Sequence, residues 1–129
     1  MATSSLPSGL GPFRPFVPAR DFATSRQFYL DLGFRESWRA DDGKLSQFIF
    51  GQHQFLLQDY WLEDWAHNTM FYQVVEDVET WWAHLQALDL PGRYGVRIRA
   101  PFHTDWNSYE IHLHDPAGVL WFFGRFKEG

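Results

Sequence analysis

Hydrophobic and polar positions recur along this chain with two periods, which predict helices and strands. At residues 21–32 and 78–88 the apolar positions return every three or four residues, which is typical of an amphipathic helix. Alternating or continuous apolar stretches predict strands at residues 13–17, 34–40, 44–50, 54–58, 69–75, 95–100, 108–114 and 119–126. The predicted order is β-α-β-β-β, followed by the same order again.

The first helical segment has an echo 56 residues further along the chain. Asp21-Phe22 corresponds to Asp77-Val78, and both aspartates stand where a side-chain oxygen caps a helix N-terminus. Such an echo at fixed spacing is the mark of a duplicated supersecondary unit. We therefore predict one βαβββ module at about residues 13–60 and a second at about 68–126. Residues 59–68 break the pattern and predict a loop or a short helical turn between them.

Two such modules predict an α+β fold. We expect their strands to form a curved mixed eight-stranded sheet with the helices on its convex side, leaving the concave side for a ligand or a partner chain. Residues 1–12 are small, polar and rich in Gly, Pro and Ser, and they predict a flexible tail before a single domain at residues 13–129.

Composition narrows the possible partners. The 129 residues carry a net charge of −5, which disfavours nucleic acid and suits a cationic ligand. The chain has 7 Trp and 13 Phe, more than a core of this size needs, so some rings should line a cleft or an interface. Without Cys there is no disulfide or thiolate site. No apolar run approaches the roughly 20 residues of a membrane span, and we expect a cytoplasmic protein without a membrane partner.

Short motifs mark the helix starts and the last turn. They are VPARDF at 17–22, Phe28-Tyr29, Leu32-Gly33-Phe34, VEDV at 75–78 and DPAG at 115–118. Together they resemble the vicinal-oxygen-chelate superfamily, which includes glyoxalases, extradiol dioxygenases and bleomycin-resistance proteins. The resemblance covers nearly all of residues 13–126 and implies the fold of paired βαβββ modules.

The resemblance also indicates where a metal would bind. Metal-dependent members carry His or Glu seven residues before each capping Asp and seven residues after the Asp of the DPxG turn, with a further ligand near the position of Leu56. Here the first three positions hold Arg14, Met70 and Phe122, none of which is a usual ligand for such cations. We therefore predict no metal and no other cofactor, which disfavours the glyoxalase and dioxygenase activities.

In lacking these metal ligands the chain resembles the bleomycin-resistance branch, whose members bind the drug without breaking it. The PxRDF start of the first helix and Asp105-Trp106 before the last hairpin point the same way. The resemblance implies an acidic homodimer with clefts at its interface, a small aromatic or cationic ligand, and Trp106 as a stacking ring.

Glu110, His112 and His114 alternate along one predicted strand and therefore share a face. A carboxylate and two imidazoles can ligate Fe or Zn, or one His can act as a base. Residues two apart on a strand are about 7 Å apart, however, and this spacing is too large for all three side chains to reach one ion easily. A polar cleft lining or a solvated strand face is the favoured interpretation.

Other aromatic and charged residues admit two interpretations each. Trp61 and Trp65 either stack on a flat cation or pack loops and a dimer interface. Arg14, Arg97 and Arg99 either hold a ligand carboxylate or stand on exposed strand faces. Trp81, Trp82 and Trp121 follow the helix and strand periods, and we predict that they belong to the core or to an interface.

The leading functional prediction is non-catalytic binding and sequestration of a small molecule, such as an antibiotic. The predicted ligand-binding residues are Trp106, Trp61, Trp65, Glu110, His112, Phe122 and Arg14. One alternative is a divergent lyase, isomerase or dioxygenase that uses Glu110 and His112 with a relocated metal. Another is an interaction protein whose exposed rings serve only dimerisation.

Overall fold

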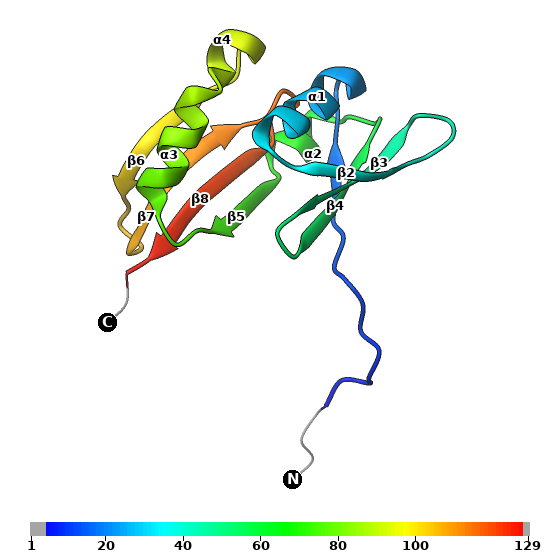
Figure 1. The fold of residues 1–129 in the computed structure, drawn as a ribbon, viewed down its shortest axis with the longest axis horizontal. Coiled ribbons are helices and arrows are strands. Elements are labelled where there is room, and N and C mark those ends of the chain that lie inside the picture. Colours follow the sequence, from blue (N-terminus) through cyan, green and yellow to red (C-terminus); the bar gives the residue numbers. More distant parts are fainter. Residues whose placement is uncertain (1–4, 128–129) are drawn as a thin grey trace.

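The computed structural model describes residues 5–127 and contains two similar halves, each a four-stranded sheet with one longer helix (Figure 1). The first half consists of β1 (Phe16–Pro18), α1 (Phe22–Leu32), β2 (Arg35–Arg39), β3 (Leu45–Phe50) and β4 (His53–Gln58). The second consists of β5 (Met70–Val74), α3 (Val78–Ala87), α4 (Leu90–Tyr94), β6 (Ile98–His103), β7 (Ser108–His114) and β8 (Leu120–Phe126). The short helix α2 (Glu63–His67) connects them.

The strand order is the same in both halves. It is β1-β4-β3-β2 in the first sheet and β5-β8-β7-β6 in the second. In each sheet the first strand pairs in parallel with the last, and the other pairs are antiparallel. The predicted α+β fold of two βαβββ modules is confirmed, with its eight strands divided between two four-stranded sheets.

The two long helices begin in the same way. The Asp21 carboxylate accepts the backbone N–H of Thr24 at 3.1 Å, and the Asp77 carboxylate accepts that of Thr80 at 3.2 Å. Each bond satisfies one of the free N–H groups of a first helical turn. The helix caps therefore repeat with the 56-residue offset seen in the sequence.

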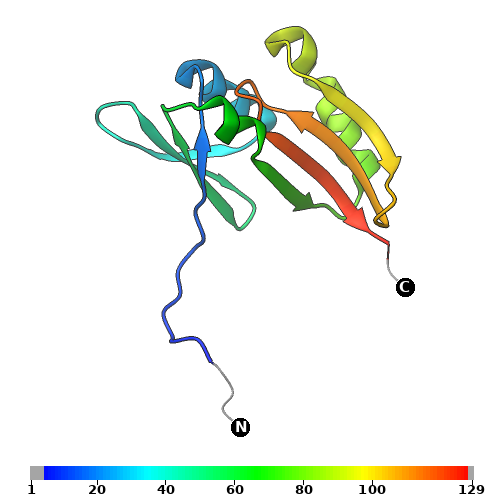
Figure 2. The same ribbon diagram turned by 180° about the vertical axis from the view of Figure 1, so that it is seen from behind.

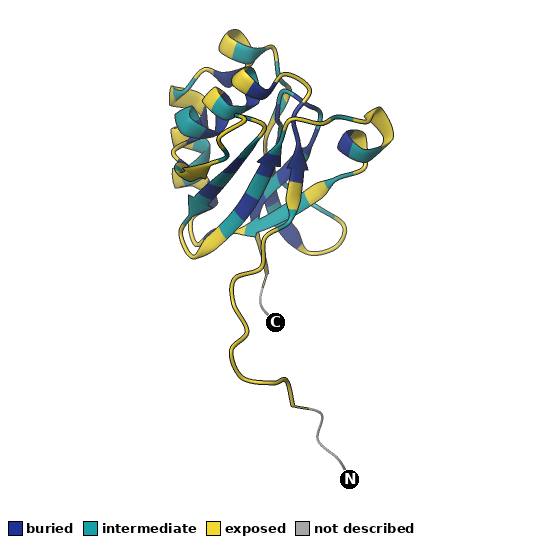
Figure 3. Ribbon diagram, turned by 90° about the vertical axis from the view of Figure 1, so that its right-hand side faces the viewer, coloured by how far each residue is buried: buried dark blue, intermediate teal, exposed yellow. Residues whose placement is uncertain are grey.

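Both halves share one hydrophobic core on the helix side of the sheets. Figures 1 and 2 show α1 and α3 on one side, with the strands in front in the reverse view, and buried residues gather between the layers (Figure 3). At the centre the hydroxyl of Tyr29 donates to Asp115 at 2.5 Å and accepts from the indole N–H of Trp121 at 3.0 Å. Because Tyr29 lies on α1 and its partners in the second half, this network ties the halves together.

The sheet faces turned away from α1 and α3 are less covered. On β7 the residues Tyr109, Ile111 and Leu113 pack into or against the core. Successive strand residues point to opposite faces, so Glu110, His112 and His114 lie on the other face. We call this the open face of the second sheet.

Several element boundaries differ from the prediction. β6 runs to His103, so residues 101–103 are strand rather than loop. The register shifts between Arg99 and Phe102, and Pro101 falls in that irregularity, where its missing N–H disturbs the ladder least. The second helix stops at Ala87, and Pro91 lies in the first turn of α4 instead of ending a longer helix.

The segments outside the modules are partly as predicted. Residues 59–68 contain the short helix α2, as expected for a loop or a helical turn. Residues 5–15 form no helix or strand and extend away from the sheets (Figure 1), whereas residues 1–4 of the predicted tail lie outside the described part. Among the described residues no helix has the length and apolar character needed to cross a bilayer.

Candidate functional site

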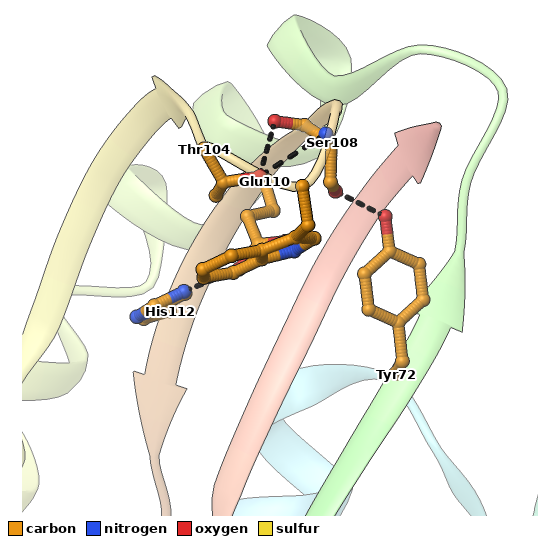
Figure 4. Close-up of polar contacts among 6 residues, drawn as sticks. Tyr72, Thr104, Ser108, Glu110 and His112 are labelled. Carbon is orange, nitrogen blue, oxygen red and sulfur yellow. Dashed lines mark hydrogen bonds and ion pairs between the residues drawn. The ribbon is translucent and has the colours of Figure 1, made fainter. Parts of the chain in front are cut away.

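Glu110 lies on the open face of the second sheet, yet its side chain is 0% exposed. One carboxylate oxygen accepts the indole N–H of Trp106 at 3.2 Å, and the other lies 2.5 Å from Nε2 of His112 (Figure 4). A buried carboxylate needs such partners because burial removes its hydration. Here both partners are side chains rather than backbone groups.

The turn between β6 and β7 positions Trp106 above this carboxylate. The hydroxyl of Thr104 accepts the backbone N–H of Ser108 at 3.1 Å and donates to the Ser108 carbonyl at 3.2 Å (Figure 4). The backbone N–H of Thr104 also donates to that carbonyl, at 2.8 Å. Asn107 completes the turn in the left-handed region at φ 69°, which Asn tolerates better than most residues. The indole of Trp106 remains 56% exposed although its N–H is bound.

Aromatic rings from all four strands of the second sheet lie around the carboxylate. The edges of His112 meet Phe122 at 4.5 Å and Phe102 at 4.9 Å between ring centres. Tyr72 stacks with Phe122 at 6.0 Å and with Phe126 at 4.9 Å. These rings form an apolar wall with polar groups at its base, the usual composition of a ligand site.

Tyr72 adds a polar group that stays protonated near neutral pH. Its hydroxyl lies 2.5 Å from that of Ser108 (Figure 4). Burial raises the pKa of Tyr72, the Ser108 hydrogen bond opposes this, and the charge of Glu110 adds to the rise. The site therefore offers a neutral hydroxyl pair beside a carboxylate. We call Tyr72, Trp106, Glu110, His112 and Phe122 the Glu110 site.

Four of the predicted ligand-binding residues lie together in this site: Trp106, Glu110, His112 and Phe122. Strand register brings these side chains close together, because Phe122 of β8 is paired with His112 of β7 on one side and with Tyr72 of β5 on the other. The sequence prediction missed Tyr72 and Ser108. Tyr72 could have been found from the alternation of residues 69–75 combined with the parallel pairing of β5 and β8.

Trp61 and Trp65 lie elsewhere. The indole of Trp61 donates to the Ala117 carbonyl at 2.9 Å, and the guanidinium of Arg20 lies 4.6 Å from the centre of its ring. Ala117 follows the end of β7, whereas Trp106 precedes its start, and the strand between them is roughly 20 Å long. Trp65 is half-buried on α2, 6.2 Å from the ring of Tyr60. The structure therefore does not bring these two indoles to Glu110.

The positions that correspond to metal ligands in the sequence prediction carry no suitable donors. Arg14 donates to the side chain of Gln54 at 2.5 Å, Met70 is 61% exposed on β5, and Phe122 packs among aromatic rings. Within residues 5–127 no three His, Asp or Glu side chains are grouped to hold an ion. Nε2 of His114 lies 3.4 Å from the Arg97 guanidinium, whereas Nε2 of His112 contacts the Glu110 carboxylate. These residues do not fit the metal of the metal-dependent relatives.

A hollow of about 710 Å³ lies between the two halves and not at Glu110. Aromatic and aliphatic side chains line it together with His53 and His84, and no carboxylate contributes. The Nε2 atom of His84 is already bonded to the Leu32 carbonyl at 2.9 Å. Because volume alone does not make a recognition site, we place the candidate site at Glu110, where polar groups converge.

Paired βαβββ modules with a polar and aromatic sheet face define a class of two-module α+β proteins. A protein-family model described as the Glyoxalase/Bleomycin resistance protein/Dioxygenase superfamily matches residues 12–123. The chain belongs to this superfamily, as the sequence motifs predicted.

Solved structures show the same fold at low sequence identity. A bleomycin-binding protein in complex with bleomycin is 20% identical, with a TM-score of 0.74 over 92% of this chain and 100% of that one. The bleomycin resistance determinant of transposon Tn5 is 20% identical, with a TM-score of 0.73 over the same shares. A lactoylglutathione lyase from Agrobacterium tumefaciens, also 20% identical, has a TM-score of 0.64 over 92% and 94%. Among curated proteins none matches the chain.

Proposed function

We propose that the protein binds and sequesters a small molecule with a flat, cationic group at the Glu110 site, without transforming it. The observation that carries this proposal is the buried carboxylate of Glu110, which among the described residues is held by the Trp106 and His112 side chains alone and has aromatic rings around it. A carboxylate at the base of an aromatic wall is suited to a positive charge on a planar ligand.

Two physical effects would supply the affinity. A cation over an aromatic face gains about 0.5–2 kcal/mol, depending on desolvation. A charge-assisted bond to Glu110 adds more, because the attraction is screened less at a buried carboxylate than in water. Neither effect needs a chemical step, so binding alone would remove the ligand from solution.

The proposed ligand class agrees with the printed descriptions of two structural neighbours, a bleomycin-binding protein and a bleomycin resistance determinant. We propose an antibiotic or a similar natural product as the ligand. We also propose a homodimer. Met70 and Val74 on β5 are 61% and 63% exposed, and Phe126 on β8 is 51% exposed beside the site. A second copy would cover this apolar border and enclose the Glu110 site between the two chains.

Calorimetric titration with bleomycin and with thiamine, which contains a flat thiazolium cation, tests the proposal. We expect saturable binding of at least one compound and a loss of about tenfold or more in Trp106→Ala, since stacking and cation–π contacts are worth about that much. Trp38→Ala is the matched control, because Trp38 is 51% exposed on β2 of the first sheet. An equal loss in both variants, or binding of neither compound to wild type, would contradict the proposal.

A second candidate function rests on the 2.5 Å contact between Glu110 and His112. A carboxylate that orients an imidazole is a common arrangement for a general base, and a lyase is among the structural neighbours. Chromatography of the recovered ligand separates this from sequestration. Product that forms with wild type but not with His112→Gln, while the variant still binds, would favour catalysis.

A further inference from the structure

A group of cationic side chains lies on the second sheet at the far end of β7 from Trp106. A hollow of about 520 Å³ is lined there by Arg97, Arg99, His112 and His114, together with Pro91, Val96 and Ile98. No Asp or Glu lines it. We call this the Arg97 hollow.

The pairing of β6 with β7 brings these groups together. Arg99 is paired with His112, and the backbone N–H of His114 donates to the carbonyl of Arg97 at 3.0 Å. The Arg97 guanidinium lies 3.4 Å from Nε2 of His114. The guanidinium of Arg99 lies 3.5 Å from the ring centre of Phe102, which holds it over the sheet. The strand register therefore keeps two guanidinium groups and two imidazoles at one place.

A smaller adjoining hollow extends the positive region. It shares Arg97 and His114 and adds Arg20 and His67. Its one acidic residue is Asp115, whose carboxylate is buried and already accepts from Tyr29 and from the N–H groups of residues 117 and 119. Asp115 is thus engaged in the core and does not neutralise the arginines by an ion pair.

Within the described residues, neither Arg97 nor Arg99 is neutralised by a carboxylate. Arg26 and Arg93 form ion pairs with Glu36 and Asp31, whereas among residues 5–127 no ion pair involves Arg97 or Arg99. Such concentrated positive charge is unexpected on a chain with net charge −5. In addition, Nδ1 of His114 is buried and has no hydrogen-bond partner among residues 5–127. A bound anion would satisfy this atom only after the His114 ring turns to expose it.

We propose that the Arg97 hollow binds an oxyanionic group, a carboxylate, phosphate or sulfate, of the same ligand whose flat cationic part occupies the Glu110 site. This inference rests on the proposed function and specifies the ligand further. On β7 the hollow begins at His112, two residues or roughly 7 Å from Glu110, and extends to His114, roughly 13 Å from Glu110. The ligand therefore carries opposite charges separated by roughly 7–13 Å.

The chemistry of the hollow suits an oxyanion. Guanidinium groups bind carboxylates and phosphates through paired N–H donors. Burial lowers the pKa of His114, and the charges of Arg97 and His112 lower it further. A bound anion offsets that repulsion, so the pKa of His114 should rise when the anion binds. This rise is a readout that a merely structural arginine would not produce.

A matched pair of probes tests the inference. Thiamine and thiamine monophosphate share the flat cation, and only the second carries an oxyanion at a distance from it. We expect calorimetry to show that the phosphate strengthens binding by about tenfold or more, the usual worth of a charged hydrogen bond. This advantage should disappear in Arg97→Gln. It should persist in Arg35→Gln, which removes the same charge from an exposed position on β2 of the first sheet.

Titration of wild type and Glu110→Gln with inorganic phosphate, followed by the imidazole NMR signals of His112 and His114, separates the two proposals. Saturable shifts in both proteins, with a raised pKa of His114, support the anion site even if thiamine fails to bind and the proposed function falls. If thiamine binds but thiamine monophosphate binds no more tightly, the anion site is refuted and the proposed function stands. Equal losses in Arg97→Gln and Arg35→Gln would also refute it, because general charge screening would then explain the effect.

Discussion

The two modules have the same fold but use a carboxylate on their hairpins in opposite ways. Glu36 on β2 meets Arg26 of α1 in an ion pair of 2.7 Å and accepts from the Ser46 hydroxyl at 2.6 Å. Glu110 on β7 lies on the open face, and among residues 5–127 its carboxylate has only Trp106 and His112 as partners. The first carboxylate fastens a helix to its sheet, whereas the second has partners that a ligand can replace.

The two sheets also differ in the other side chains on the faces turned away from the long helices. In the first sheet the half-buried residues of β3 and β4 that alternate with the core are Leu45, Gln47, Ile49, Gln54, Leu56 and Gln58. This set holds aliphatic groups and amides but no acid or imidazole. The second sheet carries Glu110, His112 and His114 instead. Duplication thus supplied two corresponding faces, and we propose that the second one binds the ligand.

The largest expected effect tests whether the modules depend on one core. Phe55→Ala in the first module and Phe123→Ala in the second should each lower the free energy of unfolding by about 3–5 kcal/mol, because each removes a buried ring. Urea unfolding followed by circular dichroism should show one transition in both variants. A second transition, with the unmutated module still folded, would contradict a shared core.

The next effect concerns the contact between modules at Asp115. Burial raises the pKa of Asp115 from 3.8 to about 6. Between these values the unfolded chain has lost the proton while the folded chain retains it, so this group's contribution to stability falls as pH rises. Compared with Asp115→Asn, wild type should lose roughly 3 kcal/mol between about pH 4 and pH 6, at about 1.4 kcal/mol per pKa unit. Parallel stability profiles in urea would contradict the assignment.

Substitutions of Glu36 and Glu110 should have smaller effects, and these effects should fall on different properties. Glu36→Gln should cost about 1 kcal/mol of stability at pH 7 and leave ligand binding unchanged. The hydrogen bond from Arg26 lowers the pKa of Glu36, so its contribution is present above the unfolded pKa, about 4.3, and is lost as pH falls through the folded pKa. Glu110→Gln should instead weaken binding of a flat cation by about tenfold or more. Calorimetry and urea unfolding of both variants check the contrast, which fails if the roles are exchanged.

The smallest effect should be equal in the two modules. Asp21→Ala and Asp77→Ala each remove one N-cap bond, and each should cost about 1 kcal/mol. Thermal unfolding of the two variants measures this. A clear difference between them would show that the helix starts are not equivalent despite their matching geometry.

Much of the fold was predictable because it depends on local patterns. The helix caps, the repeated order of elements and the turn at 115–118 follow from residue type and spacing. The pairing of Glu110 with His112 was partly predictable, since alternation places both on one face. The boundaries of β6 were not, because the irregularity at Pro101 depends on the neighbouring strand.

The remaining parts of the site depend on contacts that no local pattern encodes. Tyr72 reaches the site only because β5 pairs with β8, far away in the sequence. Trp61 and Trp106 look equivalent in the sequence, yet the indole of Trp61 bonds to Ala117 and that of Trp106 to Glu110. Only the three-dimensional arrangement separates a packing tryptophan from one at the candidate site.

The central claim is that the open face of the second sheet, and not that of the first, binds the ligand. The most direct measurement is NMR mapping of the full chain during titration with thiamine monophosphate, following side-chain signals from both sheets. The account predicts shifts concentrated at Tyr72, Trp106, His112 and Phe122, with the signals of Trp38 and Ile49 unchanged. Shifts concentrated on the first sheet, or in the large hollow beside Trp81 and His84, would contradict it.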